Sequence, residues 1–143
     1  MNIWDKLIEA AKTEYHPEKV SPFIDAHHVA CAIEAENGKI YSGFCIEGAS
    51  GVIALCAERV AALKMYMESG QTVVKKVACY INGEPDGKGG WTPCGACREF
   101  FLQLNEKNKD IEILLDVNGY KTVKLIDLMP DWWGWKRYNK KDS

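Results

Sequence analysis

The stretch TPCGACREFF, residues 92–101, carries the strongest indication of fold and function in this chain. Pro93 stands before a run with the composition of a helix, and proline suits a first helical turn because its missing N–H would have no partner there. Cys94 and Cys97 are compatible with a redox-active pair, with half of a metal site or with two small buried side chains. The choice depends on whether a third soft ligand and a proton carrier exist elsewhere in the chain.

Helix and strand signals alternate on both sides of this stretch. In chain order, the sequence predicts a helix (3–15), a hairpin (27–48), a helix (54–70), a strand (73–82), a helix (93–107) and two strands (111–117 and 121–125). No repeat or linker interrupts the chain, so we expect a single domain over residues 1–143. This order predicts an α/β protein, a three-layer α/β/α arrangement with a mixed sheet of about five strands.

A third cysteine stands at the predicted start of another helix, in CAER, residues 56–59. Free backbone N–H groups and the helix dipole favour a thiolate at such a position. If the strand over 73–82 places the two helices side by side, Cys56, Cys94 and Cys97 can bind one tetrahedral ion. Three protein ligands and an open fourth position describe a catalytic zinc site, whereas a structural site would close that position.

The residues after Cys56 can supply the proton chemistry that such a site needs. Zinc lowers the pKa of bound water from 15.7 to roughly 7. A hydrolytic zinc site also requires a group that moves protons, and Glu58, two residues beyond Cys56, is placed to do so without being a ligand. Three thiolates on Zn²⁺ leave a net negative centre, which Arg59 and Arg98 can offset. Either arginine can equally be a surface charge.

Composition and charge exclude several classes of function. The chain has 143 residues, 47% of them hydrophobic and 27% charged, as in ordinary globular proteins. A net charge of -2 argues against sequence-independent binding of nucleic acid, which requires many basic side chains. No apolar run reaches the roughly 18 residues of a membrane span, and the start has acids where a signal peptide would be basic and apolar. We therefore expect a cytoplasmic protein with neither nucleic acid nor membrane as partner.

The six cysteines are expected to be reduced thiols in that compartment. Cys31 and Cys79 lie in apolar strand-like runs, where a buried structural cysteine is the default interpretation. Together with Cys45 they stand alone in their strands, so none of the three offers the spacing of a fourth zinc ligand.

These motifs resemble a known family. A Cys-x-Glu followed by Pro-Cys-x-x-Cys is similar to the signature of zinc nucleobase deaminases. Residues 29–59, 93–98 and 128–134 resemble the compact free-nucleoside branch of the cytidine deaminase family, and the chain is also similar to blasticidin-S deaminase. The resemblance implies hydrolytic deamination of a free cytosine nucleoside or related amino-heterocycle, with one zinc per subunit and a homotetramer with shared active sites. By match to the motif it assigns the zinc to Cys56, Cys94 and Cys97, the proton shuttle to Glu58 and a hydrogen bond to the thiolates to Arg59.

Two departures from the family pattern concern the substrate. The family holds the ribose hydroxyl with an Asn-x-Glu pair, and here Glu47 remains while Cys45 replaces the asparagine. A thiol donates and accepts hydrogen bonds more weakly than an amide does, so selectivity for the sugar is expected to change. His27 stands where the family often has a base-stacking phenylalanine. It can stack, supply a hydrogen bond, or be a plain strand-surface histidine.

A third departure lies in the closing motif, LMPDWWG at residues 128–134, which Trp135 follows. Trp133 takes the place of the family's phenylalanine. Three tryptophans of about 200 Å² each are not expected to be all exposed. They can pack on the core or on a neighbouring subunit, or form an aromatic lid over a flat heterocycle.

The identity of the heterocycle, and whether ribose is required, stay open from the sequence. A deaminase that acts on a base within RNA or DNA and a non-enzymatic zinc or redox module are the remaining alternatives. The first of these more often has histidine in place of Cys56 and a basic surface. The second would leave Cys56 without a role.

Overall fold

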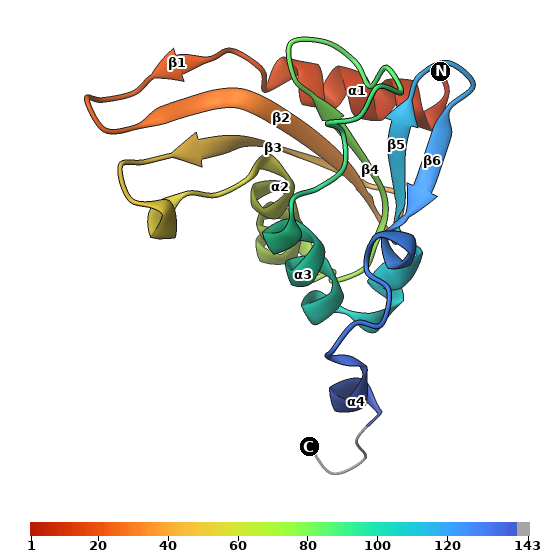
Figure 1. Cartoon of the computed structure of the whole chain (residues 1–143). Helices are drawn as coiled ribbons and strands as arrows, with labels where there is room; N and C mark the ends of the chain where they lie inside the picture. The colour runs from red at the N-terminus through yellow and green to blue at the C-terminus, as the bar shows by residue number, and fades with distance from the viewer. Residues whose placement is uncertain (140–143) are drawn as a thin grey trace.

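Residues 1–139 are described by the structure, a computed structural model of the chain (Figure 1). The first helix, α1 (Ile3–Thr13), begins where the Asn2 side chain accepts a hydrogen bond from the backbone N–H of Trp4 at 2.8 Å. Its buried face consists of Trp4, Leu7, Ile8 and Ala11. This is the apolar stripe predicted from the spacing of the sequence.

A mixed sheet of six strands forms the middle of the fold. The strands are β1 (Glu18–Lys19), β2 (Asp25–Ala35), β3 (Ile40–Glu47), β4 (Val74–Tyr80), β5 (Glu112–Asp116) and β6 (Lys121–Lys124). The order is β1-β2-β4-β5-β6, with β3 paired to β2. Among the strands of residues 1–139, only β4 and β5 pair in parallel; the other pairs are antiparallel. The strand beyond the expected five is β1, whose two residues are too short to produce an alternating pattern in the sequence.

Helices cover both faces of this sheet, as Figure 1 shows. On one face α1 packs against Ala30 and Ala32 of β2. On the other face Cys31 and Ile33 of the same strand pack with α2 (Ala57–Ser69) and α3 (Gly95–Leu104). Alternate residues of one strand therefore serve two cores, which confirms the three-layer α/β/α arrangement.

A glycine in β3 sets the distance between α2 and the sheet. A Cβ atom on Gly43 would lie 2.7 Å from the backbone N of Ala61 and 2.9 Å from the carbonyl O of Ala57. No other residue type fits in that space without moving α2. The start of α2, which carries Cys56 and Glu58, is thereby held close to the strands.

The end of α2 agrees with the prediction, whereas the start of α3 differs from it. Gly70 ends α2 in a left-handed conformation, with φ at 73°, as glycine permits. Cys56 is the N-cap residue of α2, and Cys94 is the N-cap residue of α3. Pro93 was predicted within the first helical turn, and this was wrong. The backbone of Cys94 is extended, with ψ at 169°, so the proline lies before the cap.

Short helical segments complete the chain. They are η1 (Gly51–Ile53), η2 (Glu106–Asp110), η3 (Leu125–Leu128) and α4 (Trp135–Tyr138). Within residues 1–139, no helix combines the length and the apolar character that a membrane crossing requires.

Candidate active site and metal centre

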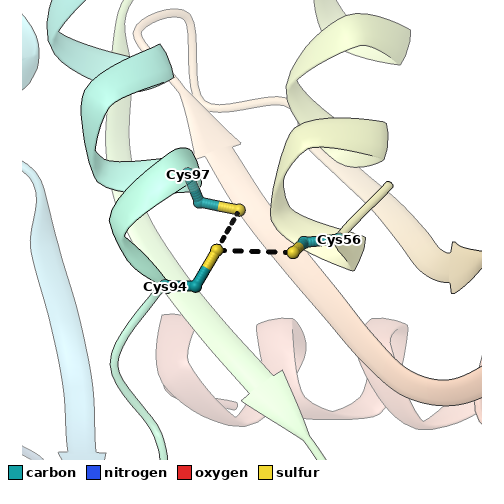
Figure 2. A group of neighbouring side chains, drawn as sticks. All are labelled: Cys56, Cys94 and Cys97. Atoms are coloured by element: carbon teal, nitrogen blue, oxygen red, sulfur yellow. Dashed lines mark hydrogen bonds between the residues drawn. The ribbon is translucent and has the colours of Figure 1, made fainter. Parts of the chain in front are cut away.

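Three sulfur atoms meet where α2 and α3 begin side by side (Figure 2). Cys94 Sγ lies 3.4 Å from Cys56 Sγ and 3.6 Å from Cys97 Sγ. All three atoms lie within 4.8 Å of one another. The strand β4 connects the two helices in the sequence and lies in the sheet beneath them, so the predicted convergence of the three cysteines is present in the fold.

Local electrostatics prepare one of these thiols for metal binding. Burial alone would raise the pKa of Cys94. Hydrogen bonds from the backbone N–H of Cys97, with the Cys56 and Cys97 thiols and from the backbone N–H of Ala96 outweigh it and lower the pKa. Burial raises the pKa of Cys97, and the negative charges of Glu58, Cys56 and Cys94 raise it further. This crowding of like charge favours a bound cation.

The carboxyl group of Glu58 lies in the first turn of α2 and is only 5% exposed. Burial raises its pKa above the ordinary glutamate value, against the hydrogen bonds it receives from its own backbone N–H and from the Cys97 and Cys79 thiols. The Cys79 thiol donates to Glu58 Oε1 at 3.7 Å. A buried carboxyl with a raised pKa can hold a proton closer to neutral pH than an exposed one.

A second group of ligand-type side chains lies behind Glu58. Cys31 and Cys79 are paired residues of neighbouring strands β2 and β4, and together with Glu58 they form a buried cluster. The expectation that these two cysteines stand alone was therefore wrong, because strand pairing joins residues 48 positions apart. Burial raises the pKa of Cys31. The pKa of Cys79 is also raised, mainly by its hydrogen bond to Cys31 and next by burial. Both shifts favour the protonated form of these two thiols.

A small cavity opens beside the thiols and Glu58. Its volume is about 180 Å³. The side chains of Val29, Glu58, Cys79, Ile81, Trp91 and the thiols of Cys56 and Cys94 are among those that line it. Sequence reasoning missed Trp91 and Cys79. The available signal for Trp91 was its place as the one large apolar residue in the loop GEPDGKGGW, two positions before Pro93.

The two predicted arginines lie in different surroundings. Arg59 Nη2 donates to Cys56 Sγ at 3.5 Å, and the Nε atom of Arg59 is buried without a hydrogen-bond partner in the described chain. Arg98 lines a separate groove with Trp132 and Trp133. Among residues 1–139, no side-chain hydrogen bond joins Arg98 to any of the three sulfurs, so only Arg59 is brought to the thiols.

The predicted substrate residues on β2 and β3 do not line this cavity. His27 is buried, has a left-handed backbone with φ at 64°, and stacks between the rings of His16 and Phe44 at 3.6 and 3.5 Å. Cys45 Sγ accepts the backbone N–H of Val29 at 3.2 Å. Glu47 is exposed and lies 3.2 Å from His28 Nε2.

Trp133 also lies away from the cavity. It is 63% exposed, and its indole N–H and that of Trp132 both donate to the Glu99 carboxylate, at 3.2 and 3.0 Å. Trp132 is buried and makes an edge-on contact with Trp135 at 5.1 Å between ring centroids. Within one chain, Trp132 therefore packs in the core and Trp133 is exposed.

Comparison with known proteins identifies the family. The family described as "Cytidine and deoxycytidylate deaminase zinc-binding region" matches residues 4–111, which include all three cysteines at the helix starts. The chain belongs to this deaminase family. It is therefore a zinc-dependent aminohydrolase, and zinc is its cofactor.

Individual relatives of this deaminase extend over most of its length. A cytidine deaminase of Mycoplasma pneumoniae is 37% identical over 124 residues, which cover 87% of this chain and 86% of the relative. A blasticidin-S deaminase of Bacillus cereus is 32% identical over 110 residues, or 73% and 75% of the two chains. The crystal structure of cytidine deaminase from Mycobacterium tuberculosis matches with a TM-score of 0.66 and 26% identity, covering 92% of this chain and 97% of the other.

The donor set of the deaminase fits the zinc ion that its family requires. Sulfur ligands at about 2.3 Å in a tetrahedral arrangement lie about 3.8 Å apart. The distances of 3.4 and 3.6 Å from Cys94 to its two neighbours are close to that value. Cys94 is exposed toward the cavity, whereas every member of the Cys31, Glu58 and Cys79 cluster is buried. The first cluster thus presents an exposed thiol to the cavity, whereas the second borders the cavity only through the buried side chains of Glu58 and Cys79.

Proposed function

We propose that this deaminase hydrolyses a free cytosine nucleoside or a related amino-heterocycle, with Cys56, Cys94 and Cys97 as zinc ligands and Glu58 as the proton carrier. The observation that supports it most directly is the meeting of three sulfurs from two helix starts beside a buried carboxyl group. A small cavity adjoins both. A redox pair at Cys94 and Cys97 would give no role to Cys56, which lies 3.4 Å from Cys94.

The overall reaction adds water to the amino-bearing ring carbon and releases ammonia. A C–O bond forms at that carbon and the C–N bond breaks. The water must lose a proton, a ring nitrogen must gain one, and the departing amine must leave as ammonia. Each of these transfers requires a group that can both accept and donate a proton within reach of the ring.

Glu58 has the properties of that group. Burial raises its pKa, so its two protonation states are closer in free energy at neutral pH than those of an exposed glutamate. Zinc, when bound, supplies a water molecule whose pKa is lowered to roughly 7. Arg59 donates to Cys56 Sγ and offsets part of the negative charge of the thiolates.

The size of the cavity supports a division of the substrate into two parts. A volume of about 180 Å³ is below the ~300–1,000 Å³ of pockets that enclose drug-sized ligands. A single flat ring fits there, and a sugar would lie outside it. Cys45, Glu47 and His27, which the family resemblance assigns to substrate binding, lie outside that cavity too. They are available for the sugar side of the substrate.

Trp133 and the assembly state form a further part of the proposal. We infer a homotetramer, as the family resemblance implies, in which neighbouring chains complete one another's sites. Exposed apolar side chains support an association: Phe23, Val52 and Trp133 are 69%, 94% and 63% exposed. Arg98 and Trp133 line one groove and would face a neighbour together.

We also place the enzyme in the cytoplasm. All six cysteines are free thiols, which a reducing compartment preserves.

The proposal is tested by metal analysis and a substrate panel. Purified protein is expected to contain one zinc per chain and to release ammonia from cytidine, deoxycytidine or cytosine. Blasticidin S belongs in the panel because a blasticidin-S deaminase is among the relatives. Single-stranded oligonucleotides serve as the negative arm. Absence of zinc, or ammonia release only from oligonucleotides, would overturn the proposal.

A further inference from the structure

The loop between β4 and α3, which leads into the metal site, is hydrogen-bonded to the end of β5. The backbone N–H of Gly87 donates to Leu115 O at 2.9 Å, and that of Val117 donates to Pro85 O at 3.0 Å. Asp86 pairs with Asp116 as an isolated bridge beside β5. Gly87 adopts φ of 77°, and a Cβ atom there would lie 2.5 Å from the Asp116 carboxylate. The middle of the loop is therefore fixed by its own backbone.

Trp91 is held in place by this anchored segment. Its indole N–H donates to Asp86 Oδ1 at 3.0 Å. The same oxygen accepts the backbone N–H of Lys88 at 2.9 Å, which orients the carboxylate. Trp91 also packs against the core cluster that contains Cys97 and Phe101. The indole thus has its polar atom satisfied and its ring supported from behind, which is an arrangement for presenting a fixed aromatic surface.

That surface forms part of the cavity wall. Trp91 lines the cavity with the apolar part of its ring, because its indole N–H already donates to Asp86. The other apolar wall residues are Val29 and Ile81, while Glu58 and the cysteine thiols supply the reactive side. A planar ring held between apolar walls and a single proton carrier is positioned by shape and stacking more than by hydrogen bonds.

We propose that Trp91 is the specificity-determining residue of this site: the wall that admits a single six-membered amino-heterocycle and excludes a fused two-ring base. Asp86 is its positioning residue. The inference rests on the proposed function and adds the residue that sets its substrate class. At about 180 Å³ the cavity has little spare room, and the indole is the largest side chain in its wall, so removing it enlarges the cavity. Neither residue was indicated by the metal-site motif.

The test compares cytidine with adenosine as substrates, and uridine with inosine as ligands, for four variants. Trp91→Ala is expected to lower kcat/KM for cytidine about 10- to 100-fold, the range found when aromatic stacking on a base is removed. It should make adenosine a detectable substrate and shift the uridine-to-inosine affinity ratio at least about tenfold toward inosine. Trp91→Phe keeps a smaller aromatic wall and should lie between Trp91→Ala and the unaltered enzyme.

Asp86 provides a variant pair that does not touch the cavity. Asp86→Ala should raise KM for cytidine with little change in kcat, because the indole loses its anchor. Asp86→Asn keeps an oxygen acceptor for the indole N–H and should restore KM. Zinc content and circular dichroism verify that each variant is folded and loaded. If Trp91→Ala fails to fold, the Asp86 pair and Trp91→Phe carry the test.

The outcomes separate the inference from the function on which it rests. If the unaltered enzyme deaminates cytidine and Trp91→Ala leaves the cytidine-to-adenosine ratio unchanged, the wall inference fails while the function stands. If the unaltered enzyme deaminates no member of the substrate panel given under the proposed function, the proposed function fails. The uridine-to-inosine binding ratio, measured by calorimetry in the unaltered enzyme and in Trp91→Ala, then decides the wall inference without any turnover.

Discussion

Cys56 Sγ and Cys94 Sγ lie 3.4 Å apart although 38 positions separate them in the chain. Each is the N-cap residue of its helix, and the strand between the two helices lies in the sheet beneath both. Two sulfurs so placed lose their mutual repulsion only when a proton or a cation lies between them. With Cys97 they form a three-sulfur group that borders the cavity.

Substitution of the cysteines should distinguish the two thiol clusters. Cys56→Ala or Cys97→Ala is expected to abolish zinc binding, because two remaining sulfurs give an incomplete tetrahedral site. Cys31→Ala is the matched control, since Cys31 belongs to the cluster with Cys79 and Glu58. It should keep one zinc per chain in elemental analysis. Loss of zinc from Cys31→Ala with retention in Cys56→Ala would reverse the assignment.

Glu58→Gln should remove catalysis and spare the metal. The amide keeps the shape of the side chain and cannot carry a proton, so kcat is expected to fall about 10²–10⁴-fold. Glu34 is also buried but lies at the end of β2 nearest Lys76 of β4, and Glu34→Gln controls for the loss of a buried carboxylate. Ammonia release and zinc content are measured on both variants. Activity in Glu58→Gln within a few-fold of the unaltered enzyme would mean that another group carries the proton.

The pH dependence of stability provides a separate test of Glu58. Burial raises its pKa in the folded chain above the unfolded value, so the folded state holds its proton more tightly. This group therefore contributes full stability below the unfolded pKa and loses that contribution as pH rises through the folded pKa. In metal-free protein, Glu58→Gln should gain stability relative to the unaltered chain as pH is raised from 4 to 7. Urea unfolding at several pH values measures it, and a difference that stays constant with pH would contradict it.

Cys45→Asn tests whether the missing amide weakens recognition of the sugar. Cys45 is buried and its sulfur accepts the backbone N–H of Val29, a bond that an amide oxygen can also accept. The added NH₂ group can then serve a hydroxyl, so kcat/KM for cytidine relative to cytosine should rise about tenfold or more. Cys45→Ala is the control, because it removes the acceptor and adds no donor. Equal cytidine-to-cytosine ratios in both variants would show that this position does not contact the sugar.

Much of this molecule could be inferred from local signals in the sequence. The stripe of α1, the hairpin of β2 and β3 and the glycine that ends α2 each depend on residues a few positions apart. The motifs around Cys56 and Cys94 predicted that the three thiols meet, because helix starts and ligand spacing are also local. The wrong position of Pro93 relative to α3 was an error of one or two residues, the usual uncertainty at a helix end.

Other features depend on which residues the sheet brings together. Cys31 meets Cys79 because β2 and β4 pair in one register, and a shift of one residue would turn both away from Glu58. His27 stacks between His16 and Phe44 where the β2–β3 register shifts, which no alternation pattern indicates.

The sequence by itself determined the layer architecture, the three thiols and the carboxyl beside them, because helix caps and ligand spacing are written in neighbouring residues. Only the tertiary structure decided that Trp91 forms a wall of the cavity and that Arg59, not Arg98, reaches the sulfurs. Those contacts join side chains from separate elements, and their directions are set by packing between layers, which local residue patterns do not encode.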